Sequence, residues 1–264
     1  MSVGDLPGAL ARLRRGARRM RGLVLVALLA AFAVTATTIW QLGRVSGNGT
    51  TGTTGGTGGG DVVRVGVPDG GSVPDYAERS RADLAGLVGG GGTGQVLALV
   101  TLRGYRAPDQ LTPVLDGVSL AQAYARVPLP HLQTQIVRLD AYRAPDDVVG
   151  GMDRVAARKD SEAADYARLV AHLTAAADSE GDLRAVYTSG QRIAVAEAAA
   201  YRSHCACVYA AVVRASPAAL DALAHRDDVR MVDPAPEVRR LDRGVFLPPL
   251  PEQRERAGPP DNSG

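Results

Sequence analysis

Residues 208–236, VYAAVVRASPAALDALAHRDDVRMVDPAP, contain the pattern that decides the fold. The apolar run over 206–214 predicts a strand, and the proline-led stretch 217–224 predicts a short helix because its leucines fall on one side. A further strand is predicted over 229–232, where a Pro-x-Pro pair then ends it. The segment is therefore expected to form a strand–helix–strand unit.

An earlier part of the chain repeats this plan. Residues 95–103 predict an apolar strand, residues 108–115 a short helix, and residues 121–127 a strand that another Pro-x-Pro pair stops. Two such units in one sheet predict an α+β domain of ferredoxin-like, or split βαβ, topology. Another open α/β sheet is the alternative. A single sequence does not separate internal duplication from the recurrence of a common motif.

Two long amphipathic stretches lie between the repeated units. Apolar residues at three- and four-residue steps predict helices over 146–177 and 183–201. The sequence DSEGD at 178–182 is expected to form the turn between them, with Gly181 ending the first helix. The pair is therefore predicted to be an αα-hairpin inserted between the halves of the sheet.

Three further elements complete the predicted domain. The alternating sequence of residues 62–67 indicates a strand, as does that of residues 133–142. Residues 74–88 show helical spacing and end in a run of glycines. We expect the folded domain to span residues 61–240.

The N-terminal region carries a signal for a membrane. Residues 22–43 contain no charge, and as a helix they would reach about 33 Å, enough to cross a hydrocarbon core of about 30 Å. The predicted anchor includes Leu23, Leu25, Leu28, Leu29, Phe32, Ile39 and the interfacial Trp40. The leader 1–21 contains Arg12, Arg14, Arg15, Arg18, Arg19 and Arg21. This arginine excess predicts a cytoplasmic N-terminus and an extracellular C-terminal domain.

A cleaved signal peptide is the alternative interpretation of this region. The apolar stretch is longer than the 7 to 15 residues, roughly, that signal peptides use, which favours an uncleaved signal-anchor. Residues 44–60 are expected to form a flexible Gly/Thr linker. Counted from Gly43, these 18 residues have a root-mean-square span of about 23 Å as a coil. The domain should therefore stay close to the membrane.

The chain contains two cysteines, Cys205 and Cys207. In a strand, residues two apart lie about 6.6 Å from each other, whereas a disulfide needs Cβ atoms about 3.5 to 4.5 Å apart. The pair is therefore expected to be small buried residues, with a strained redox pair or an intermolecular bridge as alternatives. Neighbouring His204 would face the other way in a strand, so no metal site is assigned.

No segment supplies a specific catalytic motif. The glycine run 89–94 lacks the Lys-Ser/Thr of a phosphate-binding loop, and no GxSxG occurs. We therefore assign no catalytic, cofactor-binding or metal-binding residue and expect no cofactor. The formal net charge of +2 is smaller than the arginine excess of the leader, so the domain shows no basic stripe for nucleic acid.

The tail 241–264 is proline-rich and is expected to lose regular structure. Phe246, Leu247, Pro248 and Pro249 form a preset extended segment of the kind that binds a partner. Two alternatives remain open, a segment packed back over the domain and an inert tail. Arg239, Arg240 and Arg243 precede this segment as a basic run, which is either a partner-facing patch or solvated.

SPAALDALAHRDDVRMVDPAP, residues 216–236, resembles the closing helix and strand of inhibitor I9 propeptides, the ferredoxin-like pro-domains of subtilisin-type proteases. The resemblance rests on Leu220, Leu223, Val229 and Val232 and implies a fold and an association role. The whole chain resembles uncharacterised single-pass envelope proteins of high-GC Gram-positive bacteria, which implies no activity.

These observations favour an anchored, exported module that binds another envelope protein or regulates it, without catalysis. An exported hydrolase or metal-dependent enzyme with scattered site residues is one alternative. A protease-inhibitor-like domain is another. Besides lipid around the anchor, the expected partner is another envelope protein, and nucleic acid is not expected.

Overall fold

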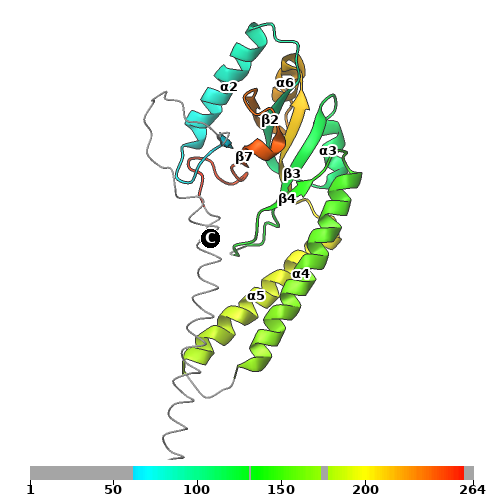
Figure 1. The fold of residues 1–264 in the computed structure, drawn as a ribbon. Coiled ribbons are helices and arrows are strands. Elements are labelled where there is room, and N and C mark those ends of the chain that lie inside the picture. Colours follow the sequence, from blue (N-terminus) through cyan, green and yellow to red (C-terminus); the bar gives the residue numbers. More distant parts are fainter. Residues whose placement is uncertain (1–61, 131, 174–177, 259–264) are drawn as a thin grey trace, which may run out of the picture. The chain divides into compact units, whose positions relative to one another are not determined.

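A computed structural model describes residues 62–130, 132–173 and 178–258 of the chain as a mixed α+β structure. Its main sheet has five strands in the order β4–β3–β5–β2–β6, and each neighbouring pair is antiparallel (Figure 1). The strands are β2 (Val96–Arg106), β3 (Ser119–Ala125), β4 (Val137–Asp140), β5 (Val208–Ala215) and β6 (Val229–Ala235). The predicted α+β class is confirmed.

Two strand–helix–strand units supply four of these strands. In the first unit α3 (Pro108–Val114) connects β2 to β3, and in the second α6 (Pro217–Ala224) connects β5 to β6. Each helix begins at a proline, which needs no N–H partner in the first turn. The Ser216 hydroxyl also accepts a hydrogen bond from the Ala219 N–H at 3.3 Å. Both predicted units are therefore confirmed.

The sheet is buried on both faces, as its apolar central strands require. Alternate residues of β2 enter two different cores. Ala98 and Val100 pack with the core that contains α3, α6 and the start of α4, whereas Leu97 and Leu99 pack with the core on the other face. We call these the helix face and the ribbon face of the sheet.

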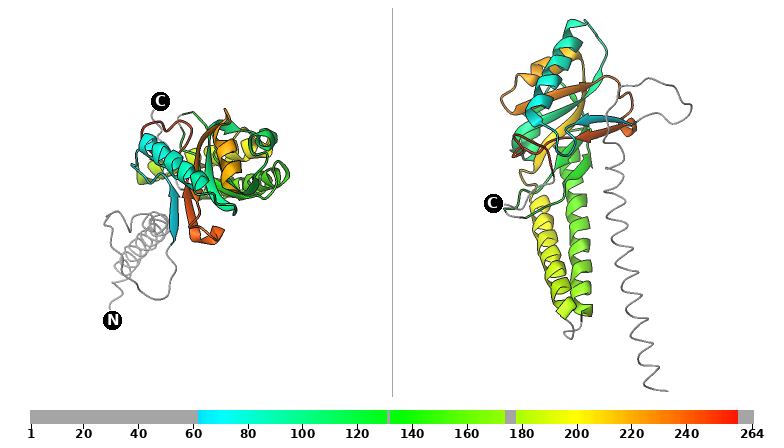
Figure 2. Two further views of the ribbon diagram at one scale, coloured as in Figure 1. Left: turned by 90° about the horizontal axis from the view of Figure 1, so that it is seen from above. Right: turned by 90° about the vertical axis from the view of Figure 1, so that its left-hand side faces the viewer.

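The ribbon face is covered by two short strands from opposite ends of the domain. Strand β1 (Val63–Gly66) pairs in parallel with β7 (Gly244–Leu247), which follows a single 3-10 turn, η1 (Leu241–Arg243). Figure 2 shows the two-stranded ribbon of β1 and β7 from two directions. Val65 and Phe246 are register partners, and both are buried. The expectation of an irregular tail is therefore wrong for these residues.

Helix α2 (Val73–Gly89) lies beside β6 at one edge of the sheet and also contacts α6 (Figure 1). The Ser72 hydroxyl caps it by accepting the Asp75 N–H at 3.3 Å. Its buried residues include Val73 and Tyr76, which pack with Met231 of β6. This packing positions one side of α2 above the end of β6.

Two long helices, α4 (Asp146–His172) and α5 (Asp178–Arg202), form the predicted hairpin and extend away from the sheet (Figure 1). The base of the hairpin is fixed because Met152, Val155 and Tyr201 belong to the helix-face core. The predicted turn at 178–182 is wrong, since α5 begins at Asp178.

The predicted leader, anchor and linker, residues 1–21, 22–43 and 44–60, lie outside the described residues. Within the ranges that the structure describes, we find no helix with both the length and the apolar character needed to span a bilayer.

Candidate functional site

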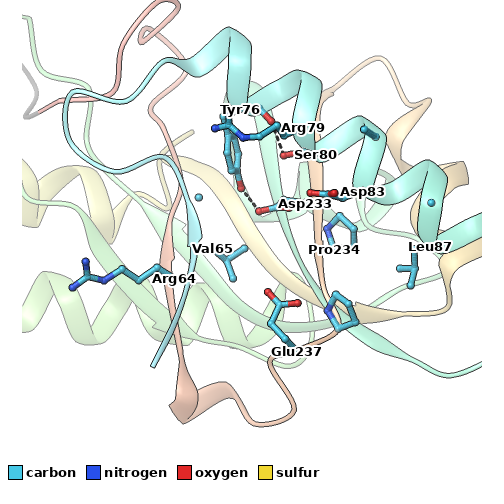
Figure 3. Close-up of a pocket in the computed structure, with 14 residues that line it drawn as sticks. Arg64, Val65, Tyr76, Arg79, Ser80, Asp83, Leu87, Asp233, Pro234 and Glu237 are labelled. Atoms are coloured by element: carbon cyan, nitrogen blue, oxygen red, sulfur yellow. Dashed lines mark hydrogen bonds between the residues drawn. The ribbon is translucent and has the colours of Figure 1, made fainter. Parts of the chain in front are cut away.

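A groove of about 560 Å³ lies between α2 and the end of β6 (Figure 3). One wall is α2, the floor is the end of β6, and β1 closes the remaining side. Its apolar lining includes Val65, Leu87, Pro234 and Pro236, and its polar lining includes Tyr76, Arg79, Asp83, Asp233 and Glu237. Three segments far apart in the sequence therefore build the groove.

Tyr76 and Asp233 form the central polar contact of the groove. The Tyr76 hydroxyl donates a hydrogen bond to the Asp233 carboxylate, as the dashed line in Figure 3 marks. The pKa of Asp233 is raised to about 6, mainly by burial and also by the neighbouring carboxylates Asp83 and Glu237, although the Tyr76 hydrogen bond acts in the opposite direction. Burial also raises the pKa of Tyr76 well above its usual range. The phenol therefore stays protonated while Asp233 titrates near pH 6.

The charges around this pair define what the groove accepts. Asp83, Asp233 and Glu237 line it together with Arg79 and Arg64. Figure 3 shows the Arg64 side chain directed away from the other lining residues. The interior of the groove therefore combines three carboxylates and Arg79 with an apolar wall, and the excess of acidic groups suits a ligand with a cationic group next to an aliphatic one.

The groove does not offer a sheet edge for strand addition. Strand β6 is the edge strand of the main sheet, and Pro234 within it has no N–H to donate to an added strand. Pro236 follows directly after the strand and also lacks an N–H. A bound segment would therefore be held mainly by side-chain contacts.

Apart from its carboxylates and Tyr76, the described lining of the groove offers few nucleophiles. The lining contains neither histidine nor cysteine. Its only hydroxyl side chain of the serine type, Ser80, is buried and donates to the Tyr76 carbonyl oxygen at 2.9 Å. The Ser80 hydroxyl is therefore engaged within its own helix.

A second groove, of about 410 Å³, lies along the hairpin. Its centre is Lys159, whose ammonium donates to Glu197 at 2.8 Å and to Glu162 at 2.9 Å. Burial alone would lower the pKa of Lys159, but these hydrogen bonds raise it. Glu197 also accepts the Gln135 N–H at 3.0 Å. This network fixes the hairpin to the segment before β4 and leaves Lys159 without a nucleophilic role.

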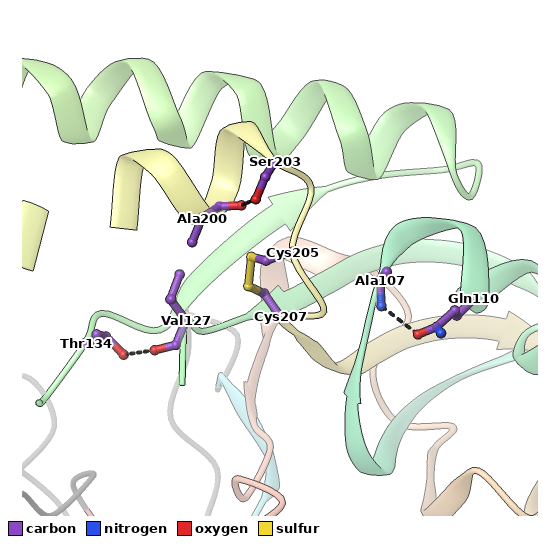
Figure 4. The surroundings of a disulfide bond; sticks show 8 residues. All are labelled: Ala107, Gln110, Val127, Thr134, Ala200, Ser203, Cys205 and Cys207. Carbon is purple, nitrogen blue, oxygen red and sulfur yellow. Dashed lines mark hydrogen bonds between the residues drawn. A yellow bond between two sulfur atoms is a disulfide. The ribbon is translucent and has the colours of Figure 1, made fainter. Parts of the chain in front are cut away.

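Cys205 and Cys207 form a disulfide, so the expectation of two separate thiols is wrong (Figure 4). The strand predicted from residue 206 begins at Val208, and the preceding residues form a bend with His204 at a φ of 52°. The bend brings the two Cα atoms to 5.3 Å, closer than an extended strand allows. Cys207 is buried, and Cys205 is half-buried.

The described histidines do not converge on one site. His204 contacts the exposed Asp153 at 2.9 Å, and His225 contacts the Asp221 carbonyl oxygen at 2.7 Å. His172 lies in the last turn of α4, and His131 is outside the described residues. Among the residues that the structure covers, no group of three His, Cys, Asp or Glu side chains is placed to hold a metal ion.

The structure places the candidate partner-binding residues of the tail against the ribbon face. Phe246 and Pro249 are buried, whereas Leu247 and Pro248 are half-buried. This packing favours a tail folded back over the domain. The fully buried Leu250, which sequence reasoning did not single out, belongs to the same core as Phe246.

The groove residues were missed by the sequence analysis because they come from separate elements. Asp233 stands among the last residues of an apolar strand, and Tyr76 falls on the apolar side of a helix, so neither position marks a site in the sequence. The order of residues gives a weak signal for the site. An acidic residue that follows apolar strand residues and precedes a proline is unusual at the buried edge of a sheet. That signal does not identify the tyrosine partner.

The comparisons with known proteins give no match. No family model, no curated protein and no solved structure is similar to this chain.

Proposed function

We propose that this chain is a single-pass membrane protein whose exported domain binds a segment of another envelope protein without catalysing a reaction. Residues 22–43 anchor it, the arginine-rich leader stays in the cytoplasm, and the domain after residue 60 lies outside. The disulfide between Cys205 and Cys207 supports export, because disulfides persist in oxidising compartments and are rare in the cytosol.

We also propose that the domain is ferredoxin-like. The order β6–β2–β5–β3 and the alternation of two strand–helix–strand units support the split βαβ arrangement. In this view β4 and the hairpin of α4 and α5 are an insertion between the two halves. The sheet then serves as a rigid support for the groove at its edge.

The observation that carries the binding proposal is the groove between α2 and β6. Its carboxylates Asp83, Asp233 and Glu237 lie in one hollow with an aliphatic wall that includes Leu87. Such a lining fits a lysine or arginine of a partner segment, together with an apolar neighbour of that residue. The prolines at the edge of the sheet leave side-chain recognition as the main mode.

A site-specific photo-crosslinker in the full-length protein, in intact cells, tests this proposal. The crosslinker replaces Leu87 in the groove, and a matched control replaces Tyr142, which is 69% exposed and follows β4 at the opposite edge of the sheet. A defined envelope protein should be captured from position 87 and not from position 142. Its contact residues, mapped by mass spectrometry, should include a lysine or arginine.

Charge-neutral variants make the same experiment more specific. The double variant Asp83→Asn and Glu237→Gln should lower the crosslinking yield roughly tenfold or more, because it removes charged acceptors for the partner's cation. Asp165→Asn, an exposed carboxylate on α4, should leave the yield unchanged. Equal capture from both crosslinker positions, or equal yields from both variants, would contradict the groove as the binding site.

The topology is tested separately by proteolysis of wall-stripped cells. A protease added outside should digest the domain while the cells are intact. Protection of the domain until lysis would overturn the proposed export.

A further inference from the structure

The ribbon formed by β1 and β7 has an outward face that differs from its buried face. Arg64 and Val245 are register partners, one position away from the buried pair of Val65 and Phe246. Since neighbouring residues of a strand point to opposite sides, Arg64 and Val245 point away from the sheet. Both are exposed, Val245 by 41%. Figure 3 shows the Arg64 side chain extending outward from β1.

Further exposed arginines and an exposed aliphatic residue adjoin these two strands in the sequence. Val62, directly before β1, is 54% exposed. Arg239, Arg240 and Arg243 are exposed in the segment that leads into β7. Asp242 is hydrogen-bonded to Arg240 at 2.7 Å and neutralises part of the charge. We name the set the basic ribbon face, and it consists of Val62, Arg64, Arg239, Arg240, Arg243 and Val245.

The basic ribbon face combines two properties that suit a lipid headgroup region. Guanidinium groups bind phosphate oxygens in pairs of hydrogen bonds, and exposed aliphatic side chains enter the boundary between headgroups and acyl chains. Asp61, Glu237 and Asp242 are the acidic residues adjoining it in sequence, against four arginines. The net charge of the face is therefore positive and complementary to an anionic surface.

The position of the face along the chain decides between a lipid surface and other anionic partners. Only Asp61 separates Val62 from the segment 44–60, so the face begins where the proposed tether ends. A tether with a root-mean-square span of about 23 Å holds a weak surface-binding patch at high effective concentration next to the bilayer. A soluble anionic partner has no such advantage.

We propose that the basic ribbon face docks on the anionic headgroups of the bilayer that holds the anchor. This inference rests on the proposed function, because it needs the anchor at residues 22–43. The domain then alternates between a docked and an undocked position, and the anionic lipid content of the membrane sets the balance.

Full-length protein in proteoliposomes tests the proposal. Val245→Cys carries a polarity-sensitive fluorophore, and the vesicles contain brominated lipid as quencher in phosphatidylcholine alone or with phosphatidylglycerol. Tyr142→Cys is the control label position. Emission from position 245 should shift to the blue and be quenched with phosphatidylglycerol. Salt at 0.5 M should abolish both effects, because it shortens the Debye length to about 4 Å. Position 142 should not respond.

Variants identify the arginines responsible. Arg239→Gln with Arg240→Gln should lower the ratio of docked to undocked protein roughly 30-fold, if each arginine near the surface contributes as basic residues ordinarily do. Arg138→Gln with Arg143→Gln removes the same charge from exposed positions beside β4 and should have little effect. Equal responses in neutral vesicles, or equal effects of the two double variants, would overturn the proposal.

Flotation of the proteoliposomes after an alkaline wash distinguishes a failure of the proposed anchor from a failure of the docking surface alone. Protein that no longer floats with the vesicles has no anchor, which overturns the proposed function and this inference together. Protein that floats but shows no response to phosphatidylglycerol overturns the docking surface alone.

Discussion

The two faces of the main sheet are covered in different ways. On the helix face, α3 and α6 lie next in sequence to the strands they cover. On the ribbon face, β1 and β7 come from opposite ends of the domain and pair across a long separation in sequence. The local periodicity of apolar residues therefore predicts the helices that cover the helix face, but it does not predict the strands that cover the ribbon face. Both covers contain side chains that are almost fully buried, so we expect both to support stability.

The largest expected loss of stability tests whether the coverings of the two sheet faces contribute equally to the free energy of unfolding. Phe246→Ala should lower the free energy of unfolding by about 3–5 kcal/mol, because it removes a buried aromatic ring from the ribbon face. Leu220→Ala on the helix face should cost about 2–5 kcal/mol. Urea unfolding of the full chain in detergent measures both. If Phe246→Ala costs no more than the exposed-site control Val245→Ala, the tail is not part of the fold.

The next effect concerns the pairing of the two terminal strands. Gly66 has a φ of +120°, and a Cβ at this position would lie 2.2 Å from the Leu247 carbonyl oxygen. Gly66→Ala should therefore lower the free energy of unfolding by about 2–3 kcal/mol, from backbone strain and forced separation of β1 from β7. Gly70→Ala is the control, because its φ of +77° is similarly left-handed but its Cβ meets no atom within 4 Å. A loss of equal size in both variants would mean that the close contact between the strands is unimportant.

Asp233, which lies where β6 meets α2, should make the free energy of unfolding depend on pH. Its folded pKa of about 6 lies above the ordinary value of 3.8, so the folded state binds the proton more tightly than the unfolded state. This contribution is complete below about pH 4 and is lost as the pH rises through 6. The free energy of unfolding at pH 7 should therefore be about 2 kcal/mol lower than at pH 4.5 from this group alone.

Asp233→Asn isolates this contribution, because the amide hardly changes the size of the side chain and does not titrate. Urea unfolding of both proteins between pH 4.5 and 7 should show that the difference between them changes over this window. A constant difference would show that Asp233 is not buried enough to titrate abnormally.

The smallest effect concerns the disulfide at the start of β5. Cys205→Ser with Cys207→Ser should lower the free energy of unfolding by about 1.5 kcal/mol, because the closed loop is very short and restricts the unfolded chain little. Adding a reductant to the unchanged protein should lower its free energy of unfolding by the same amount as the double substitution. Thermal unfolding with and without the reductant measures this. A loss as large as that of Phe246→Ala would mean that the bend at 203–207 also organises the junction of α5 with the sheet.

Much of the helix face could be predicted from the sequence, because it depends on contacts between neighbours along the chain. The helix α6 matches its predicted bounds, 217–224, since a capping serine, a proline and two leucines agree on one conformation. The hairpin was predicted as a whole, and only its turn was misplaced, since acidic residues suit both a turn and a helix start.

The ribbon face and the groove could not be predicted in the same way. Phe246 gives no local sign that it pairs beside Val65, which lies far away in the sequence. The contact of Tyr76 with Asp233 likewise depends on how α2 settles against β6. The disulfide escaped prediction because a bend at His204 replaced the expected strand, and a strand was the basis of the distance argument.

The parallel pairing of Val63–Gly66 with Gly244–Leu247 also sets the time at which the domain can finish folding. β1 leaves the ribosome early but has no partner until nearly the whole chain has been synthesised, at about 5–20 residues per second. The sheet consequently keeps one apolar side open throughout translation.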